Sequence, residues 1–339
     1  MIPHNKLTIG DEEHLAAHRV LNSGWLAQGP EVESFENELC EFLGLAPGHA
    51  VAFSSCSVAH YFALWVLSAT GKTIAFPVYV SRVLRGAVAM SGGIESLLDV
   101  EPNSPNIDIG VARALSPDIL IAPHMYGLPM DLSGLGDIKV IENCAHCLGG
   151  KVKGVATGLQ GIIGVFSFQA TKLMTSGGMG GMLVSKDKPL VDEVRGYRDF
   201  DNRRDMGAHL NFRMTDIQGA IGRAQLKKLP QWLDKRSRIF EIYKNEGLDM
   251  LDLSRDSTEI KPVRYRAVIR TEFPQNAIQE LAAQGVKSIV PIEDWELLGA
   301  PDKFPHALNL TKSTVSLPIY PALTEEQAKN IALIFKGNK

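Results

Sequence analysis

Short apolar runs alternate with longer amphipathic segments along most of this chain. From residue 50 onward, seven apolar runs have the length of strands, and helical patterns lie between many of them. Such an alternation is typical of an open, mostly parallel sheet that is covered by helices. The seven runs are VAFS, TIAF, IESLLDV, DILIAP, IKVIE, IIGVFSF and MLVS. The pattern therefore predicts an α/β fold with one large lobe built on this sheet.

The pattern changes at about residue 213. Residues 213–240 predict a long, mostly helical connector, which we expect Pro230 to break or kink. After it, PVRYRAVIR, GVKSIVPI and STVSLPI have the pattern of strands, and we expect helices near 274–284 and 324–336. These elements predict a smaller C-terminal lobe of mixed α+β structure.

Length and composition limit the class of protein. A chain of 339 residues is long for one compact unit, so we expect a large domain over 1–235, including the N-terminal segment, and a small domain over 236–339. The net charge is −3 and the basic residues are scattered, which argues against nucleic acid as a partner. Neither a signal peptide nor an apolar run of membrane-spanning length is visible, so we expect a cytoplasmic protein without a membrane partner.

The four cysteines are too few and too unevenly placed for a disulfide framework, so a reducing compartment fits. The close spacing of Cys144, His146 and Cys147 could indicate part of a metal-binding or redox site. Zinc needs about four well-placed ligands, and no second pair of Cys or His stands at a suitable spacing. We therefore expect Cys40, Cys56, Cys144 and Cys147 to be small apolar thiols, and no metal.

Polar side chains follow several of the predicted strands at the point where each strand ends. Because the carboxyl ends of parallel strands share one edge of a sheet, ligands gather there. Strand alternation puts Glu142 and Asn143 on opposite faces, so only one of them can enter a given pocket. We expect one crevice to be lined by Ser54, Ser55, Tyr79, His124, Asn143 and the loop of Lys172.

The serine-rich turn SSCSVAHYFAL joins a predicted strand to a helix that begins at about Ser57. The first free N–H groups of a helix, with the positive end of its dipole, form an anion site that suits a phosphate. Ordinary capping of the helix by Ser55 or Ser57 is the simpler alternative. The residues alone leave both interpretations open.

Lys172 is the most informative residue of the chain. It follows a predicted strand in FSFQATK and precedes the glycine-dense stretch SGGMGGM. A desolvated lysine amine loses its proton and condenses with an aldehyde cofactor as a Schiff base, while the Ser167 hydroxyl can donate to a phosphate. The alternatives are that Lys172 is a solvated surface charge and that His146 is a structural histidine. The polar strand ends around Lys172 favour the functional interpretation.

Together, five stretches resemble the DegT-type sugar aminotransferases, which are pyridoxal 5′-phosphate enzymes of fold type I, the aspartate aminotransferase fold. The stretches are LNSGWLAQGPEVESFENEL, SSCSVAHYFAL, VIENCAH, FSFQATK and NFRMTDIQGAIGRAQLKKL. The resemblance is clear from about residue 20 to residue 240 and fades beyond. It implies transfer of an amino group from an amino acid, by family habit glutamate, to a keto-sugar that is nucleotide-linked or a sugar acid.

The resemblance also implies a role for each matching residue. Lys172 would hold the cofactor covalently and move the proton between substrate and cofactor. Ser57, Val58 and Ser167 would cradle the cofactor phosphate, the first two chiefly through backbone N–H groups. His146 would contact the phenolic oxygen or the face of the cofactor ring.

Asn211 matches a residue that, in this family, reaches the phosphate from the neighbouring subunit. The resemblance therefore implies a homodimer with two shared active sites. Two other functions on the same fold stay open. A sugar dehydratase is one, although such members replace the lysine by histidine and Lys172 argues against it. A cofactor-binding regulator without turnover is the other, because the chain departs from the family pattern.

Three positions carry that departure. Asn143 stands where an aspartate pairs with the pyridine nitrogen, Ser81 stands where an aromatic residue stacks on the ring, and the glycine stretch lacks its acidic residue. Tyr79, two residues before Ser81, is the substitute that we expect to bind the cofactor. A neutral amide cannot keep the ring nitrogen protonated. The ring therefore stabilises the negative charge that develops on the substrate carbon less well, by about 1–4 kcal/mol. We expect transamination with a less protonated ring, or chemistry that needs a weaker electron sink.

The sugar itself is not specified by these motifs. The loop before Asn211 holds Arg203, Arg204 and His209. These side chains either bind a diphosphate or a sugar carboxylate, or are solvated surface charges.

Overall fold

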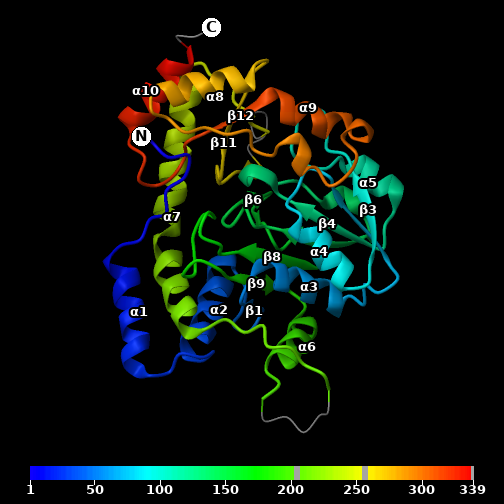
Figure 1. The fold of residues 1–339 in the computed structure, drawn as a ribbon. Coiled ribbons are helices and arrows are strands. Elements are labelled where there is room, and N and C mark those ends of the chain that lie inside the picture. Colours follow the sequence, from blue (N-terminus) through cyan, green and yellow to red (C-terminus); the bar gives the residue numbers. More distant parts are fainter. Residues whose placement is uncertain (202–206, 254–258, 337–339) are drawn as a thin grey trace.

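The computed structural model describes residues 1–201, 207–253 and 259–336. A seven-stranded sheet runs through the larger part of the molecule (Figure 1). Its strands are β1 (Ala50–Phe53), β2 (Thr73–Pro77), β3 (Ile94–Leu98), β4 (Ile119–Pro123), β5 (Lys139–Asn143), β8 (Ile163–Ser167) and β9 (Gly181–Val184). Their order is β1-β9-β8-β5-β4-β2-β3, and every neighbouring pair is parallel except the two pairs that β9 makes. The seven strands and the mostly parallel sheet expected from the sequence are confirmed.

Helices cover both faces of this sheet. They are α2 (Pro30–Leu43), α3 (Cys56–Val66), α4 (Val83–Met90), α5 (Ile109–Leu115), α6 (Lys188–Arg198) and α7 (Asp216–Asn245), and α1 (Asp11–Ser23) packs against the outer side of α7. Val51 and Phe53 of β1 pack in one core cluster with α3, α4 and α6, whereas Ala50 and Ala52 pack in a second cluster with α2 and the first half of α7. Strands that are apolar on both faces need cover on both. Among the described residues, no helix is long and apolar enough to cross a membrane.

A smaller lobe completes the molecule (Figure 1). Its elements are β11 (Ala267–Arg270), α8 (Pro274–Ala283), α9 (Pro305–Ser313), β12 (Thr314–Leu317) and α10 (Glu325–Lys336), and β11 pairs antiparallel with β12. A third, small sheet consists of β6 (Lys151–Val152), β7 (Val155–Ala156) and β10 (Ile260–Lys261). The N-terminus lies on the smaller lobe, where Ile2 forms a bridge with Val286. The helix α7 runs through residue 235, and its two halves pack in different clusters, so the domain division stays a prediction.

The structure departs from two expectations about the second half of the chain. The helix α7 is not broken at Pro230 but continues through it, and the alternative, a kink at Pro230, stays a prediction. Leu229 and Trp232 are buried beside it, and this burial outweighs the hydrogen bond that proline cannot donate. The run GVKSIVPI forms no strand, because its contact with the two-stranded sheet is a single bridge between Ile289 and Ser316.

Candidate active site

Lys172 lies in the loop after β8, at the carboxyl edge of the parallel strands. Its half-buried side chain lines two adjoining cavities, one of about 400 Å³ and one of about 280 Å³. Ser81, Asn143 and Ala145 line both cavities as well. One amine is therefore open to two neighbouring spaces.

The first turn of α3 borders the smaller cavity. The helix begins at Cys56, one residue earlier than expected, and Ser55 caps it by accepting a hydrogen bond from the N–H of Val58 at 3.4 Å. The N–H groups of Cys56 and Ser57, in the same first turn, have no helical acceptor. Ser57 is exposed and lines the cavity together with Ser167 from the end of β8. Capping by Ser55 is therefore present and uses the N–H of Val58, whereas an anion site at the N–H groups of Cys56 and Ser57 stays a prediction.

Two further residues of α3 line the smaller cavity and were not found from the sequence. His60 Nδ1 donates to the Cys56 carbonyl at 2.9 Å, and burial lowers the pKa of His60 to about 4. Burial raises the pKa of the Cys56 thiol to about 11. Both side chains are therefore neutral at pH 7, and Lys172 is the one lysine or arginine among the described residues that line this cavity. The sequence could not reveal this position, because a single histidine within an apolar helix does not indicate that it lines a cavity.

The glycine stretch shapes the wall between β9 and α3. Gly178 has a φ of 110°, in the region that side chains with a Cβ rarely adopt. At Gly181, a Cβ would lie 2.5 Å from the backbone nitrogen of Cys56. Gly181 therefore allows β9 to approach the first turn of α3, and Gly178 allows the turn that precedes β9.

Asn143 and Glu142 face opposite sides at the end of β5. The Asn143 side chain lines both cavities, and its Oδ1 accepts the N–H of Ala145 at 3.2 Å. Because an N–H group must donate to an oxygen, this bond fixes the orientation of the amide and leaves Nδ2 free to donate. A ligand atom at this point meets a donor instead of a carboxylate.

Glu142 is buried on the other face, and both of its oxygens are occupied. Its Oε2 accepts from His124 Nε2 at 2.9 Å and from the Gly158 N–H at 2.8 Å, and its Oε1 accepts from the N–H groups of Gln160 and Gly161 at 2.7 Å each. Burial raises the pKa of this carboxyl, but the hydrogen bond and charge of His124 and the backbone N–H groups more than offset it, so the pKa of Glu142 lies below its ordinary value. Glu142 therefore anchors the sheet edge that carries Asn143.

His124, Glu142 and Cys144 have ligand atoms within 4.8 Å of one another, which is close enough for a metal ion. The other ring nitrogen of His124, Nδ1, accepts the N–H of Met130 at 3.1 Å. Hydrogen bonds therefore use both nitrogens of the histidine and both oxygens of the carboxylate. This arrangement supports a structural role for the cluster.

His146 and Lys172 both lie next to the ring of Tyr265. The ring of His146 stacks on Tyr265, with centroids 4.1 Å apart and an interplanar angle of 15°, and Lys172 Nζ lies 5.3 Å from the same Tyr265 ring. Burial and the charges of Lys172 and Arg266 hold the pKa of His146 well below its ordinary value. His146 thus presents a neutral ring at the site. Tyr265, which comes from the segment before β11, was not found from the sequence.

The expected ring-stacking substitute, Tyr79, is not in the cavity. Its side chain is 0% exposed, and its hydroxyl forms a hydrogen bond with that of Tyr126 in the core. Burial raises the pKa of Tyr79 to about 12. Ser81 reaches the cavities instead, so the structure contradicts the interpretation of Tyr79 as a cofactor-binding residue.

Of the residues just before and at Asn211, those that the structure describes, 200–201 and 207–211, line neither cavity within one chain. Asn211 is exposed, and its Oδ1 accepts a backbone N–H two residues further on at 3.1 Å. His209 stacks with Phe200 at a centroid distance of 5.5 Å. Arg203 and Arg204 lie outside the described residues. A role for Asn211 in a neighbouring subunit stays a prediction.

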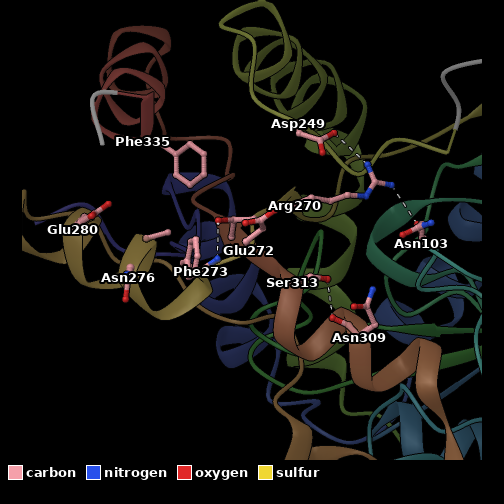
Figure 2. A pocket seen from close by; sticks show the side chains of 12 residues that line it. Asn103, Asp249, Arg270, Glu272, Phe273, Asn276, Glu280, Asn309, Ser313 and Phe335 are labelled. Atoms are coloured by element: carbon pink, nitrogen blue, oxygen red, sulfur yellow. Dashed lines mark hydrogen bonds and ion pairs between the residues drawn. The ribbon is translucent and has the colours of Figure 1, made fainter. Parts of the chain in front are cut away.

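A further cavity of about 670 Å³ lies in the smaller lobe (Figure 2). Arg270 crosses it and pairs with Asp249 at 3.3 Å, and the ring of Phe273 is exposed at its side. None of the residues expected to take part in the chemistry lines this cavity. Size alone therefore does not identify the site, and the cavities at Lys172 remain the candidates.

Known proteins match the chain over almost its whole length. The profile of the DegT/DnrJ/EryC1/StrS aminotransferase family matches residues 7–336. The chain is 26% identical to a dTDP-4-dehydro-2,3,6-trideoxy-D-glucose 4-aminotransferase of Saccharopolyspora spinosa, over 98% of this chain and 95% of that protein. It is 28% identical to a UDP-N-acetyl-3-dehydro-alpha-D-glucosamine 3-aminotransferase of Acidithiobacillus ferrooxidans, over 96% and 93%.

The fold is shared as well. The crystal structure of the aminotransferase TlmJ from Streptoalloteichus hindustanus superimposes with a TM-score of 0.91 over 99% of this chain and 98% of that chain, at 24% identity. The family match also extends well beyond residue 240, where the resemblance seen in the sequence fades. Because the match spans both lobes, the chain belongs to the DegT/DnrJ/EryC1/StrS aminotransferase family and is a pyridoxal phosphate-dependent aminotransferase.

Proposed function

We propose that the protein moves an amino group from glutamate to a nucleotide-linked keto-sugar. The observation that carries the proposal is the position of Lys172, whose side chain opens into both cavities. The smaller space, at the first turn of α3, suits a phosphorylated cofactor, and the larger space suits a substrate. Relatives named for dTDP- and UDP-linked keto-sugars support the choice of acceptor.

The described residues fit this cofactor. Pyridoxal phosphate, when bound, supplies an aldehyde that condenses with amines and a ring that withdraws electrons from the adjoining carbon. Ser57, Ser167 and the N–H groups of Cys56 and Ser57 would hold the phosphate. The amine of Lys172 would accept the proton from the α-carbon of the donor and would return it in the second half of the reaction. His146, held by its stack on Tyr265, borders the same space with a neutral ring.

Colour tests the function directly. Protein loaded with pyridoxal phosphate is expected to lose its visible absorbance when glutamate is added, because the amino group passes to the cofactor. One member of a panel of nucleotide-linked keto-sugars is then expected to restore the absorbance. Loaded protein whose colour no amino acid removes contradicts the proposal.

Asn143→Asp is expected to change the visible spectrum of the loaded protein and to speed the loss of colour with glutamate. Asn143 presents a donor, whereas an aspartate presents a carboxylate that keeps the ring nitrogen protonated. A close opposite charge supplies about one to three pKa units, so the barrier is expected to fall by about 1–4 kcal/mol. Absorbance titrations across neutral pH and single-turnover rates measure both effects.

Asn143→Ala is the matched control for this substitution. It removes the donor without adding a charge, so it is expected to leave the ring nitrogen unprotonated, as in the wild-type protein. If the aspartate and alanine variants share one spectrum and one rate, the charge at residue 143 does not govern the ring, and the interpretation is wrong.

We also propose that Asn211 completes the phosphate site of a neighbouring subunit in a homodimer. Asn211→Ala alone is expected to weaken cofactor binding about tenfold or more, because a hydrogen bond to a charged group is lost. Mixing equal amounts of Asn211→Ala and Lys172→Ala protein is expected to restore about a quarter of the wild-type sites, since each hybrid dimer has one intact site. Activity at limiting cofactor measures the recovery. No recovery after demonstrated subunit exchange contradicts a shared site.

A further inference from the structure

A group of positive charges lies where the two lobes meet, on the substrate side of Lys172. Arg266, directly before β11, lines the larger cavity with Lys172. Its guanidinium makes only long side-chain contacts among the described residues, to His4 Nε2 and to Ser316 Oγ at 3.4 Å each. No carboxylate in the described part of the chain forms an ion pair with it. Arg266 is therefore a half-buried cation with spare donors.

A second arginine lies behind it. Arg236 is 2% exposed, and its Nη1 donates to the carbonyls of Tyr265 and Ile319 at 3.2 and 2.8 Å, while its buried Nε has no partner among the described residues. Burial lowers the pKa of Arg236 to about 10, so it is charged at pH 7. Burial and the charges of Arg266, Lys287 and Arg236 lower the pKa of His4 to about 3. These neighbours add positive potential at Arg266 and supply no counterion.

The larger cavity is also lined by more basic than acidic side chains. Arg82, Lys172 and Arg266 line it, against a single carboxylate, Glu296, whose Oε2 accepts the backbone N–H of Glu293 at 2.9 Å. A partly buried charge without a partner is costly, so an anion that enters this space is stabilised. A planar guanidinium matches the two oxygens of a carboxylate better than an ammonium does. The cavity is therefore suited to a ligand that carries a carboxylate.

We propose that Arg266 binds a carboxylate of the substrate, which makes it a specificity-determining residue. The inference rests on the proposed function, because it treats the larger cavity as the substrate space. Arg266 Cζ and Lys172 Nζ lie 5.6 and 5.3 Å from the centroid of the same Tyr265 ring, so the guanidinium and the amine lie beside one aromatic side chain in the larger cavity. The carboxylate belongs either to the amino donor or to an acidic sugar, and the two sources are separated by experiment.

Calorimetric titration of the cofactor-loaded protein tests the proposal. The probes are glutarate for the donor carboxylate, glucuronate for an acidic sugar, and glucose as a neutral sugar. Arg266→Met is expected to weaken binding of at least one carboxylate about tenfold or more and to leave glucose unchanged. Arg270→Met is the matched control, because Arg270 lies at the far end of β11 in the cavity of Figure 2 and pairs with Asp249. It is expected to bind all probes like the wild type.

Each outcome decides a point. Loss confined to glutarate assigns the site to the amino donor, and loss confined to glucuronate assigns it to an acidic sugar. Arg266→Gln keeps a hydrogen-bonding side chain beside His4 and Ser316, and it replaces the Met variant if thermal unfolding shows that the latter does not fold. If glutarate and glucuronate both bind Arg266→Met and Arg266→Gln as tightly as they bind the wild type, the proposal is overturned. Because these titrations need no turnover, failure of the colour test with glutamate is a separate result that concerns the proposed reaction alone.

Discussion

Lys172→Arg is expected to abolish covalent attachment of pyridoxal phosphate and to lower transamination about a thousandfold or more. The guanidinium keeps the positive charge beside Tyr265 but does not lose its proton at neutral pH, so it neither condenses with the aldehyde nor carries the proton of the donor. The cavity walls stay in place because Lys172 forms no ion pair with any described residue and packs at the surface of the space. The expected loss is therefore one of chemistry and not of folding.

Borohydride reduction followed by peptide mass analysis measures the attachment. In the wild-type protein, the label is expected on the peptide that contains Lys172. Lys186→Arg is a suitable control, because Lys186 is an exposed lysine shortly after β9. It is expected to keep both label and activity. A label on any other lysine, or full activity of Lys172→Arg, would place the reacting amine elsewhere and remove the basis for the proposed mechanism.

The sheet was predictable from sequence because its strands are buried on both sides. β1, β4, β8 and β9 are buried at every position, so each appears in the sequence as an uninterrupted apolar run. The sheet edge that carries the candidate site followed from the same pattern. Asn143 and Ser167 end neighbouring parallel strands, and parallel strands bring their carboxyl ends to one edge.

Other residues depended on packing that local pattern does not encode. Tyr79 and Ser81 are two positions apart on the segment after β2. Tyr79 nevertheless points into the core, where its hydroxyl forms a hydrogen bond with that of Tyr126. Tyr265 and Arg266 come from a segment more than ninety positions after Lys172 along the sequence. Their position beside Lys172 in the larger cavity arises only when the smaller lobe folds against the large sheet, so no spacing rule connects them.

Glu142→Gln is expected to lower the free energy of unfolding by about 3–5 kcal/mol. A substitution of the next residue, Asn143, is expected to have a far smaller effect on stability. Both carboxylate oxygens are acceptors for two donors each. An amide turns one of these acceptors into a donor that faces two other donors in a buried place, and unsatisfied buried groups are costly. Glu95→Gln is the control, because Glu95 pairs with Arg85 near the surface and such pairs contribute at most about 1 kcal/mol. Urea unfolding of the cofactor-free protein compares the two.

The pH dependence separates the charge of Glu142 from its shape. The pKa of Glu142 is lowered in the folded protein, so its ionised form contributes stability above the unfolded carboxyl pKa of about 4.3, and that contribution is lost as pH falls through the folded value. The stability difference between wild type and Glu142→Gln is therefore expected to be largest near neutral pH and to narrow in acid. A difference that does not change with pH would assign the effect to packing. In either case Asn143, on the opposite face of β5, is expected to govern the cofactor spectrum and not the unfolding midpoint, because its amide makes one backbone hydrogen bond and otherwise faces the cavities.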